Sequence, residues 1–78
     1  MAEKPTAQEI VDIEFTIKKI VRESGLTMAE MVQKLNEKYD MNETAPAMSR
    51  HFKAGNIPFW KVKRIADLLE YELKIERK

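Results

Sequence analysis

Twice in its first 30 residues the chain places Thr-x-x-Glu directly ahead of apolar residues at helical spacing. The two stretches are TAQE at residues 6–9 and TMAE at residues 27–30. In such a capping box the threonine hydroxyl and the glutamate carboxylate each bond a backbone N–H that a helix start leaves unpaired. Isoleucines and a valine then recur with the period of a helix, at Ile10, Ile13, Ile17, Ile20 and Val21. The boxes therefore predict two consecutive helices, the first ending near Ser24-Gly25.

Two further helices are predicted downstream. Residues 40–43 break the second helix, Thr44 caps a third with Pro46 in its first turn, and Gly55 ends it. Ile57-Pro58 then opens a fourth helix. The residues expected to face the core are Met31, Val32, Leu35 and Tyr39 in the second helix, Met48 and Phe52 in the third, and Val62, Ile65, Ala66 and Leu69 in the fourth, with Phe59 buried at the edge.

The C-terminal segment has a different period. In YELKIER, residues 71–77, Tyr71, Leu73 and Ile75 alternate with charged residues, which is typical of a strand. No other segment reads as a strand, so its backbone groups need a partner from elsewhere. The simplest solution is the same strand of a second copy, antiparallel across a two-fold axis. Alternatively, the tail continues the fourth helix or frays. The expected fold class is an all-α four-helix bundle with a short C-terminal β-strand that pairs across a dimer.

Composition narrows the class of protein. The 78 residues include no cysteine, which excludes a disulfide framework or a thiolate metal site. The N-terminus lacks the apolar run of a signal peptide, and no stretch reaches the roughly 20 apolar residues of a membrane span, so we expect a cytoplasmic protein. Residues 1–47 hold six Lys/Arg against nine Asp/Glu, whereas residues 48–78 hold eight against four. This asymmetry favours a polyanion-binding face in the C-terminal half, unless these are simply solvated charges.

The third helix has an unusually small outer face. At about 100° per residue, Phe52 lies close to Met48, while Pro46, Ser49, Arg50 and Lys53 point the other way. Small side chains allow a close approach to another surface, and the arginine fork can pair with guanine O6 and N7 or with a phosphate. Such a helix is suited to the major groove of DNA, and the helix start at Thr27 presents N–H groups to a phosphate.

Several segments together carry a resemblance to a known family. GLTMAEMVQKLNEKY, TAPAMSRHFKAG and IPFWKVKRIADLLEYEL resemble the phage-repressor and Cro class of helix-turn-helix proteins. That resemblance implies a lambda-repressor-like helix-turn-helix DNA-binding domain over residues 6–70, between a disordered N-terminus at 1–5 and a dimerisation strand at 71–78. It implies that residues 44–54 enter the major groove, with base readers Ala45, Pro46, Ala47, Ser49 and Arg50. The implied DNA-backbone contacts are Thr27, Thr44, Lys53 and Asn56.

The sequence departs from the family pattern in three places. Met28 stands where the family often has Gln, and NEKYDMNETAP replaces a shorter connection. The start of the third helix, residues 45–47, has no hydrogen-bonding side chain, so direct readout rests on Arg50, Ser49 and contacts to thymine methyl groups.

The fourth helix adds candidate residues on its outer side. Lys61, close to the loop after the third helix, is expected to extend the phosphate-contacting surface. Trp60 lies nearly opposite the core stripe, either in a subunit interface or half-covered by that loop. The expected dimer interface comprises Trp60, Leu68, Tyr71, Leu73 and Ile75.

These observations favour a homodimeric, sequence-specific double-stranded DNA-binding transcriptional regulator, a repressor of phage or plasmid type. The alternative is a protein-interaction module, such as an antitoxin-like or conjugation or phage accessory protein, that binds a partner protein through Trp60, Leu68 and the C-terminal strand. An enzyme is not expected, because the sequence shows no nucleophile–base pair, metal-ligand spacing or glycine-rich phosphate loop, and His51 is the single histidine. No cofactor, metal or small-molecule effector is predicted.

Overall fold

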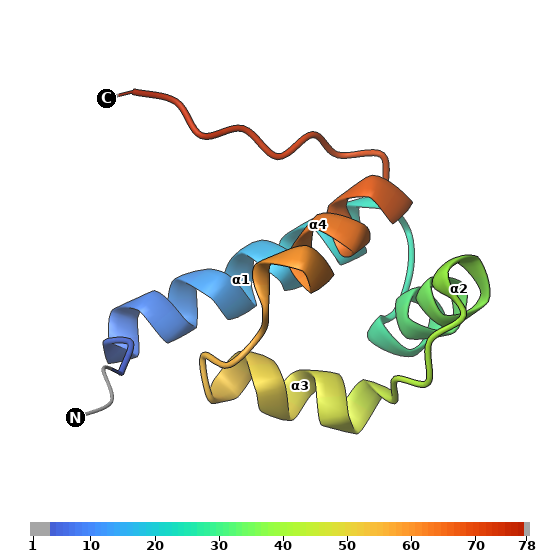
Figure 1. Cartoon of the computed structure of the whole chain (residues 1–78), viewed down its shortest axis with the longest axis horizontal. Coiled ribbons are helices and arrows are strands. Elements are labelled where there is room, and N and C mark those ends of the chain that lie inside the picture. Colours follow the sequence, from blue (N-terminus) through green and yellow to red (C-terminus); the bar gives the residue numbers. More distant parts are fainter. Residues whose placement is uncertain (1–3, 78) are drawn as a thin grey trace.

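The computed structural model describes residues 4–77 and is all-α over that range. Its four helices are α1 (Ala7–Glu23), α2 (Met28–Tyr39), α3 (Ala45–Lys53) and α4 (Phe59–Leu68) (Figure 1). None of the helices in the described part of the chain is both long and apolar enough to cross a membrane. The disordered N-terminus expected at residues 1–5 falls largely on residues 1–3, which lie outside the described residues.

The helices start where the sequence signals them. Both capping boxes are formed: the Thr6 and Thr27 hydroxyls accept from the backbone N–H of Glu9 and Glu30, each at 3.1 Å. The two glutamate carboxylates in turn accept from the threonine backbone N–H groups, at 2.7 and 3.0 Å. Thr44 caps α3 by accepting from Ala47 N–H at 3.3 Å. These local bonds fix the direction in which each helix leaves its loop.

The core is built from one face of each helix. Its buried residues are Ile17 and Val21 of α1, Met31, Val32 and Leu35 of α2, Met48 and Phe52 of α3, and Ile65 of α4. Helix α1 packs against α3, α2 packs against α4, and α2 also contacts α1 and α3. As a result α3 is held between α1 and α2 along one side of the molecule (Figure 1).

The predicted break at residues 40–43 is confirmed, and the connection between α2 and α3 is shorter than the whole stretch NEKYDMNETAP. Because α2 continues through Tyr39, the link comprises residues 40–44, with Asp40 in a left-handed conformation (φ 53°) as the helix cap. The Asn36 side chain donates to the carbonyl of Glu43 and accepts from its N–H, both at 2.9 Å. This pair of bonds fixes the start of α3 relative to α2.

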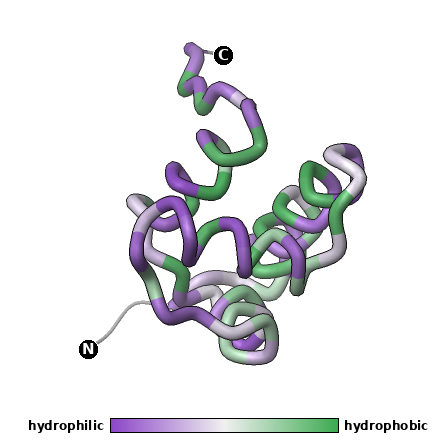
Figure 2. Tube along the Cα trace, turned by 90° about the vertical axis from the view of Figure 1, so that its right-hand side faces the viewer, coloured by the Kyte–Doolittle hydropathy of each residue, from purple (hydrophilic) through white to green (hydrophobic). Residues whose placement is uncertain are grey.

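The predicted C-terminal strand is not seen. Residues 71–77 form no regular secondary structure, and the tail stands away from the helices in both views (Figures 1 and 2). It is tied down at its base, where the Tyr71 hydroxyl donates to the Glu23 carboxylate at 3.0 Å. A strand needs a neighbouring backbone, and no element within residues 4–77 supplies one. Beyond this tie the tail is exposed at every residue from 72 to 77.

Candidate nucleic-acid interface

Helix α3 is fixed to the core by two side chains and leaves its other side in solvent. Met48 and Phe52 are completely buried, as the sequence predicts. Pro46, Arg50 and Lys53 are exposed. No acidic residue lies on α3, so its outer surface is cationic. This orientation is what a helix needs if it is to contact a polyanion without losing its anchorage.

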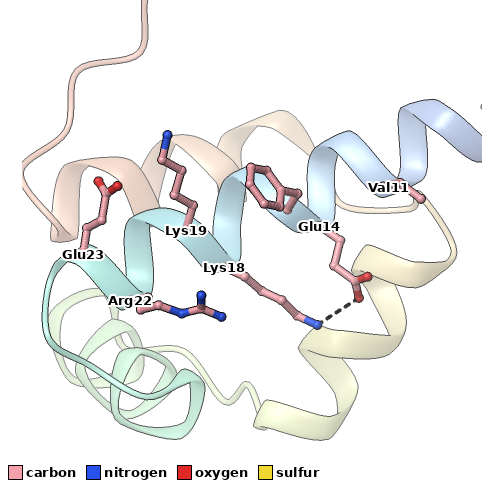
Figure 3. Close-up of a pocket in the computed structure, with 7 residues that line it drawn as sticks. Val11, Glu14, Lys18, Lys19, Arg22 and Glu23 are labelled. Carbon is pink, nitrogen blue, oxygen red and sulfur yellow. Dashed lines mark ion pairs between the residues drawn. The ribbon is translucent and has the colours of Figure 1, made fainter.

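A shallow groove of about 250 Å³ runs beside α3, where three helices meet. It is lined by Lys18, Val21 and Arg22 of α1, by Leu26, Thr27 and Met28 at the start of α2, and by Ser49 of α3. Lys18 and Arg22 point toward the side of α1 on which α2 and α3 lie (Figure 3). Lys18 forms an ion pair with Glu14 at 3.5 Å, in which the lysine is exposed and the glutamate oxygen is buried.

The chemistry of this groove is complementary to a phosphate. Two cations from α1, Ser49 of α3 and the first residues of α2 line this groove together. The positive end of the α2 dipole adds to the two side-chain charges. The groove and the exposed side of α3 form one surface, which we call the cationic face: Lys18, Arg22, Thr27, Ser49, Arg50 and Lys53.

Lys18 and Arg22 were missed by the sequence reasoning, which looked for cations only on and after the third helix. Their spacing of four residues places them on one side of the first helix. The packing of α1 against α3 brings both residues to the side of α1 next to α3. The helical period alone does not predict this packing.

The remaining predicted DNA contacts are spread along α3. Thr44 and Pro46 are exposed at its start, and Ala45 packs partly against the core. Ala47 is half-buried. At the other end Asn56 is exposed, and its backbone N–H donates to the carbonyl of His51 at 2.8 Å.

The expectation that Lys61 belongs to an exposed phosphate-contacting surface is wrong. Its side chain is buried and forms an ion pair with Glu43, from the α2–α3 connection. The lysine ammonium group therefore neutralises a carboxylate of its own chain. The periodicity that placed Lys61 outside the core stripe could not show that a long side chain from α4 reaches across to residue 43.

The aromatic residues at the start of α4 are both exposed, which was expected for Trp60 but not for Phe59. Phe59 was predicted to be buried but is 64% exposed, and Trp60 is 50% exposed. The Arg64 guanidinium lies between two rings, 4.7 Å from the centroid of Trp60 and 4.9 Å from that of Tyr39. This stacking joins α4 to the end of α2 and covers part of the tryptophan.

The five residues expected to form a dimer interface do not share one free surface. Leu68 is half-buried and packs partly against the core of its own chain. Tyr71 is half-buried at the base of the tail. Trp60, Leu73 and Ile75 are at least 44% exposed.

Residues 4–77 contain no cluster of three or more His, Cys, Asp or Glu side chains that could hold a metal ion. No family model, curated protein or solved structure matches the chain. The cationic face therefore has to be interpreted from its own chemistry.

Proposed function

We propose that the protein is a cytoplasmic, sequence-specific double-stranded DNA-binding regulator, acting as a homodimeric repressor. In this proposal α2 and α3 form a helix-turn-helix unit of the phage-repressor and Cro type, and α3 enters the major groove. The observation that carries it is the orientation of α3. Met48 and Phe52 are buried in the core, Arg50 and Lys53 are exposed, and Ser49 lines the groove with Lys18 and Arg22.

The cationic face divides into two kinds of contact. Arg50, with a planar fork of donors, reads a guanine, and Pro46 and Ala47 offer apolar contacts to thymine methyl groups. Lys18, Arg22, Lys53 and the amino end of α2 at Thr27 hold phosphates, which positions the helix without reading sequence. In a two-fold dimer the half-sites lie about 34–36 Å apart on a pseudo-palindromic operator.

The proposal is tested by selecting duplexes from a random library and titrating the best one by fluorescence anisotropy at several salt concentrations. On the selected duplex, Arg50→Ala should weaken binding by about 1–3 kcal/mol and relax the preference at one base position. Lys53→Ala should weaken binding to all duplexes alike and reduce the salt slope by about 1.

Lys74→Ala is the matched control, because it removes an exposed cation from the tail rather than from the cationic face. It should leave both the affinity and the base preference unchanged. If the unsubstituted protein shows no saturable, salt-dependent binding to any duplex, the proposed function is wrong.

A second candidate is a protein-interaction module, and the exposed apolar tail favours it. Leu73 and Ile75 are 44% and 94% exposed on a segment without secondary structure. A short extended segment of this kind can add as a strand to the sheet edge of another protein. A stoichiometric partner that survives nuclease treatment and is lost with Ile75→Glu would support this function. A partner that nuclease removes would support DNA binding.

A further inference from the structure

Helix α1 carries a second apolar stripe on the side away from the core. Val11 and Phe15 are 56% and 67% exposed, one helical turn apart. At about 100° per residue, Phe15 lies roughly 160° around the helix from the buried Ile17. Large apolar side chains at such a position add nothing to the core, so they point to a contact outside the chain.

The stripe lines a shallow hollow of about 410 Å³ in which every lining residue belongs to α1. Beside Val11 and Phe15 these are Glu14, Lys18, Lys19, Arg22 and Glu23. Figure 3 shows the charged side chains spreading to the two sides of the helix. Apolar atoms at the centre with charges at the margin are the usual pattern of a protein interface.

The charges along α1 change sign near its middle. The N-terminal half contains Glu9, Asp12 and Glu14, whereas Lys18, Lys19 and Arg22 dominate the C-terminal half. Two α1 helices that pair side by side in parallel would bring like charges together. In an antiparallel pair centred on Phe15, Asp12 lies opposite the partner's Lys19, and the relation holds in both directions.

We propose that a second copy of this chain docks on the outer face of α1, antiparallel, with the two Phe15 rings stacked at the two-fold axis. Charge complementarity between the halves of the helix selects the second copy and the antiparallel direction. The exposed tail takes no part in this contact. An interface made of one helix face lies at the lower end of the size range, so we expect a weak association, on the order of micromolar.

The arrangement has a consequence for DNA binding, which rests on the proposed function. The two-fold axis runs perpendicular to the plane of the paired helices. Because α3 lies on the side of α1 marked by Lys18 and Arg22, both copies of α3 come to the same face of the dimer. Two reading helices on one face are what a pseudo-palindromic site requires.

The experiment is a mass measurement on the nuclease-treated full chain without DNA, by light scattering and sedimentation equilibrium. The unsubstituted protein should be a dimer at about 100 μM and dissociate on dilution. Phe15→Glu should raise the dimer dissociation constant about 100-fold or more, because it removes the central anchor from both copies. Far-UV circular dichroism should stay unchanged, since Phe15 does not contribute to the core.

Two controls make the result specific. Phe59→Glu and Ile75→Glu place the same charge on other exposed apolar residues and should leave the dimer intact. Asp12→Lys and Lys19→Glu should each weaken it about tenfold, since each reversal alters two symmetry-related pairs. Combining them should restore most of the affinity. Rescue by the second charge reversal distinguishes facing helices from a general effect of charge.

A monomer at 100 μM would overturn the proposal, as would dissociation by Ile75→Glu but not by Phe15→Glu, which would assign the interface to the tail. Failure of the double reversal to restore the dimer would overturn the antiparallel register. A Phe15-dependent dimer that binds no duplex would leave this inference standing and defeat the proposed function alone.

Discussion

Lys61 carries a positive charge into the protein interior, and Glu43 offsets it. The side chains are 8% and 16% exposed, so neither ion keeps much of its hydration. A buried pair adds little net stability, but a buried charge that loses its partner is strongly destabilising. The bond also joins α4 to the connection that sets the start of α3.

Glu43→Leu should therefore lower the free energy of unfolding by about 3 kcal/mol, because the ammonium group of Lys61 is left buried without a counterion. The double variant Glu43→Leu/Lys61→Met removes both charges and should recover most of that loss. Urea unfolding followed by circular dichroism measures both values. A double variant no more stable than Glu43→Leu would contradict this account.

The two glycines share a backbone conformation but differ in their surroundings. Gly25 and Gly55 both have positive φ, 77° and 66°. A Cβ on Gly25 would meet no atom within 4 Å, whereas one on Gly55 would lie 2.7 Å from Pro5 Cγ and 2.9 Å from Ile10 Cγ1. Only the second position therefore combines backbone strain with a steric clash.

Replacing each glycine with alanine separates these two effects. Gly25→Ala should cost about 1 kcal/mol from left-handed strain alone. Gly55→Ala should cost about 1–2 kcal/mol more, because Pro5 and Ile10 must also shift. Thermal unfolding of the two variants side by side is the measurement. Equal losses would show that Pro5 and Ile10 do not restrict the space beside Gly55.

At the level of the helices, the sequence correctly predicts the features that depend on residues close together in the chain. The caps at Thr6, Thr27 and Thr44 act within three residues of themselves, and Met48 and Phe52 are spaced for one face of one helix. The errors concern Lys61 and Phe59, whose environments depend on contacts between helices. The helical period of the sequence cannot predict that the Lys61 side chain contacts Glu43 in the α2–α3 connection.

The second helix has a pH-dependent start. The Thr27 backbone N–H and then its hydroxyl bond the Glu30 carboxylate and hold its pKa below the ordinary value of 4.5. Because the folded-state pKa is lower than the unfolded one, Glu30 stabilises the fold above the unfolded pKa. That contribution is lost as the pH falls through the folded pKa.

Glu30→Gln removes this titration, so its difference in stability from the unsubstituted protein should shrink as the pH falls from 6 to about 3. Glu76→Gln in the exposed tail serves as the control for a general loss of charge. The measurement is urea unfolding at each pH. If the difference in stability between the two proteins stays constant over the whole pH range, the capping box at Thr27 does not make the stability depend on pH.

Across the whole molecule, the cationic face could be predicted only in part. Arg50, Ser49 and Lys53 follow from the helical wheel of α3, but Lys18 and Arg22 join them through the crossing of α1 over α3. Likewise the period of two in residues 71–77 indicates an extended chain but not a partner for it. A strand forms hydrogen bonds with a second backbone segment, and the period of two does not identify that segment.

A chain that ends at Tyr71 tests how the tail contributes. Tyr71 is held at both its backbone and its ring, since its N–H donates to the Ala66 carbonyl at 2.8 Å and its hydroxyl donates to Glu23. Residues 72–77 are exposed and add nothing to the core. Removing residues 72–78 should therefore leave the melting temperature unchanged, and if α1 forms the interface the mass in solution should remain that of a dimer.

A chain that ends at Glu70 should melt at a lower temperature, because it also loses both bonds of Tyr71. Circular dichroism melting and light scattering on the two truncated chains give the answer. If the cut after Tyr71 produces a monomer, the tail joins the two copies, and Leu73 and Ile75 then become the contacts to substitute next.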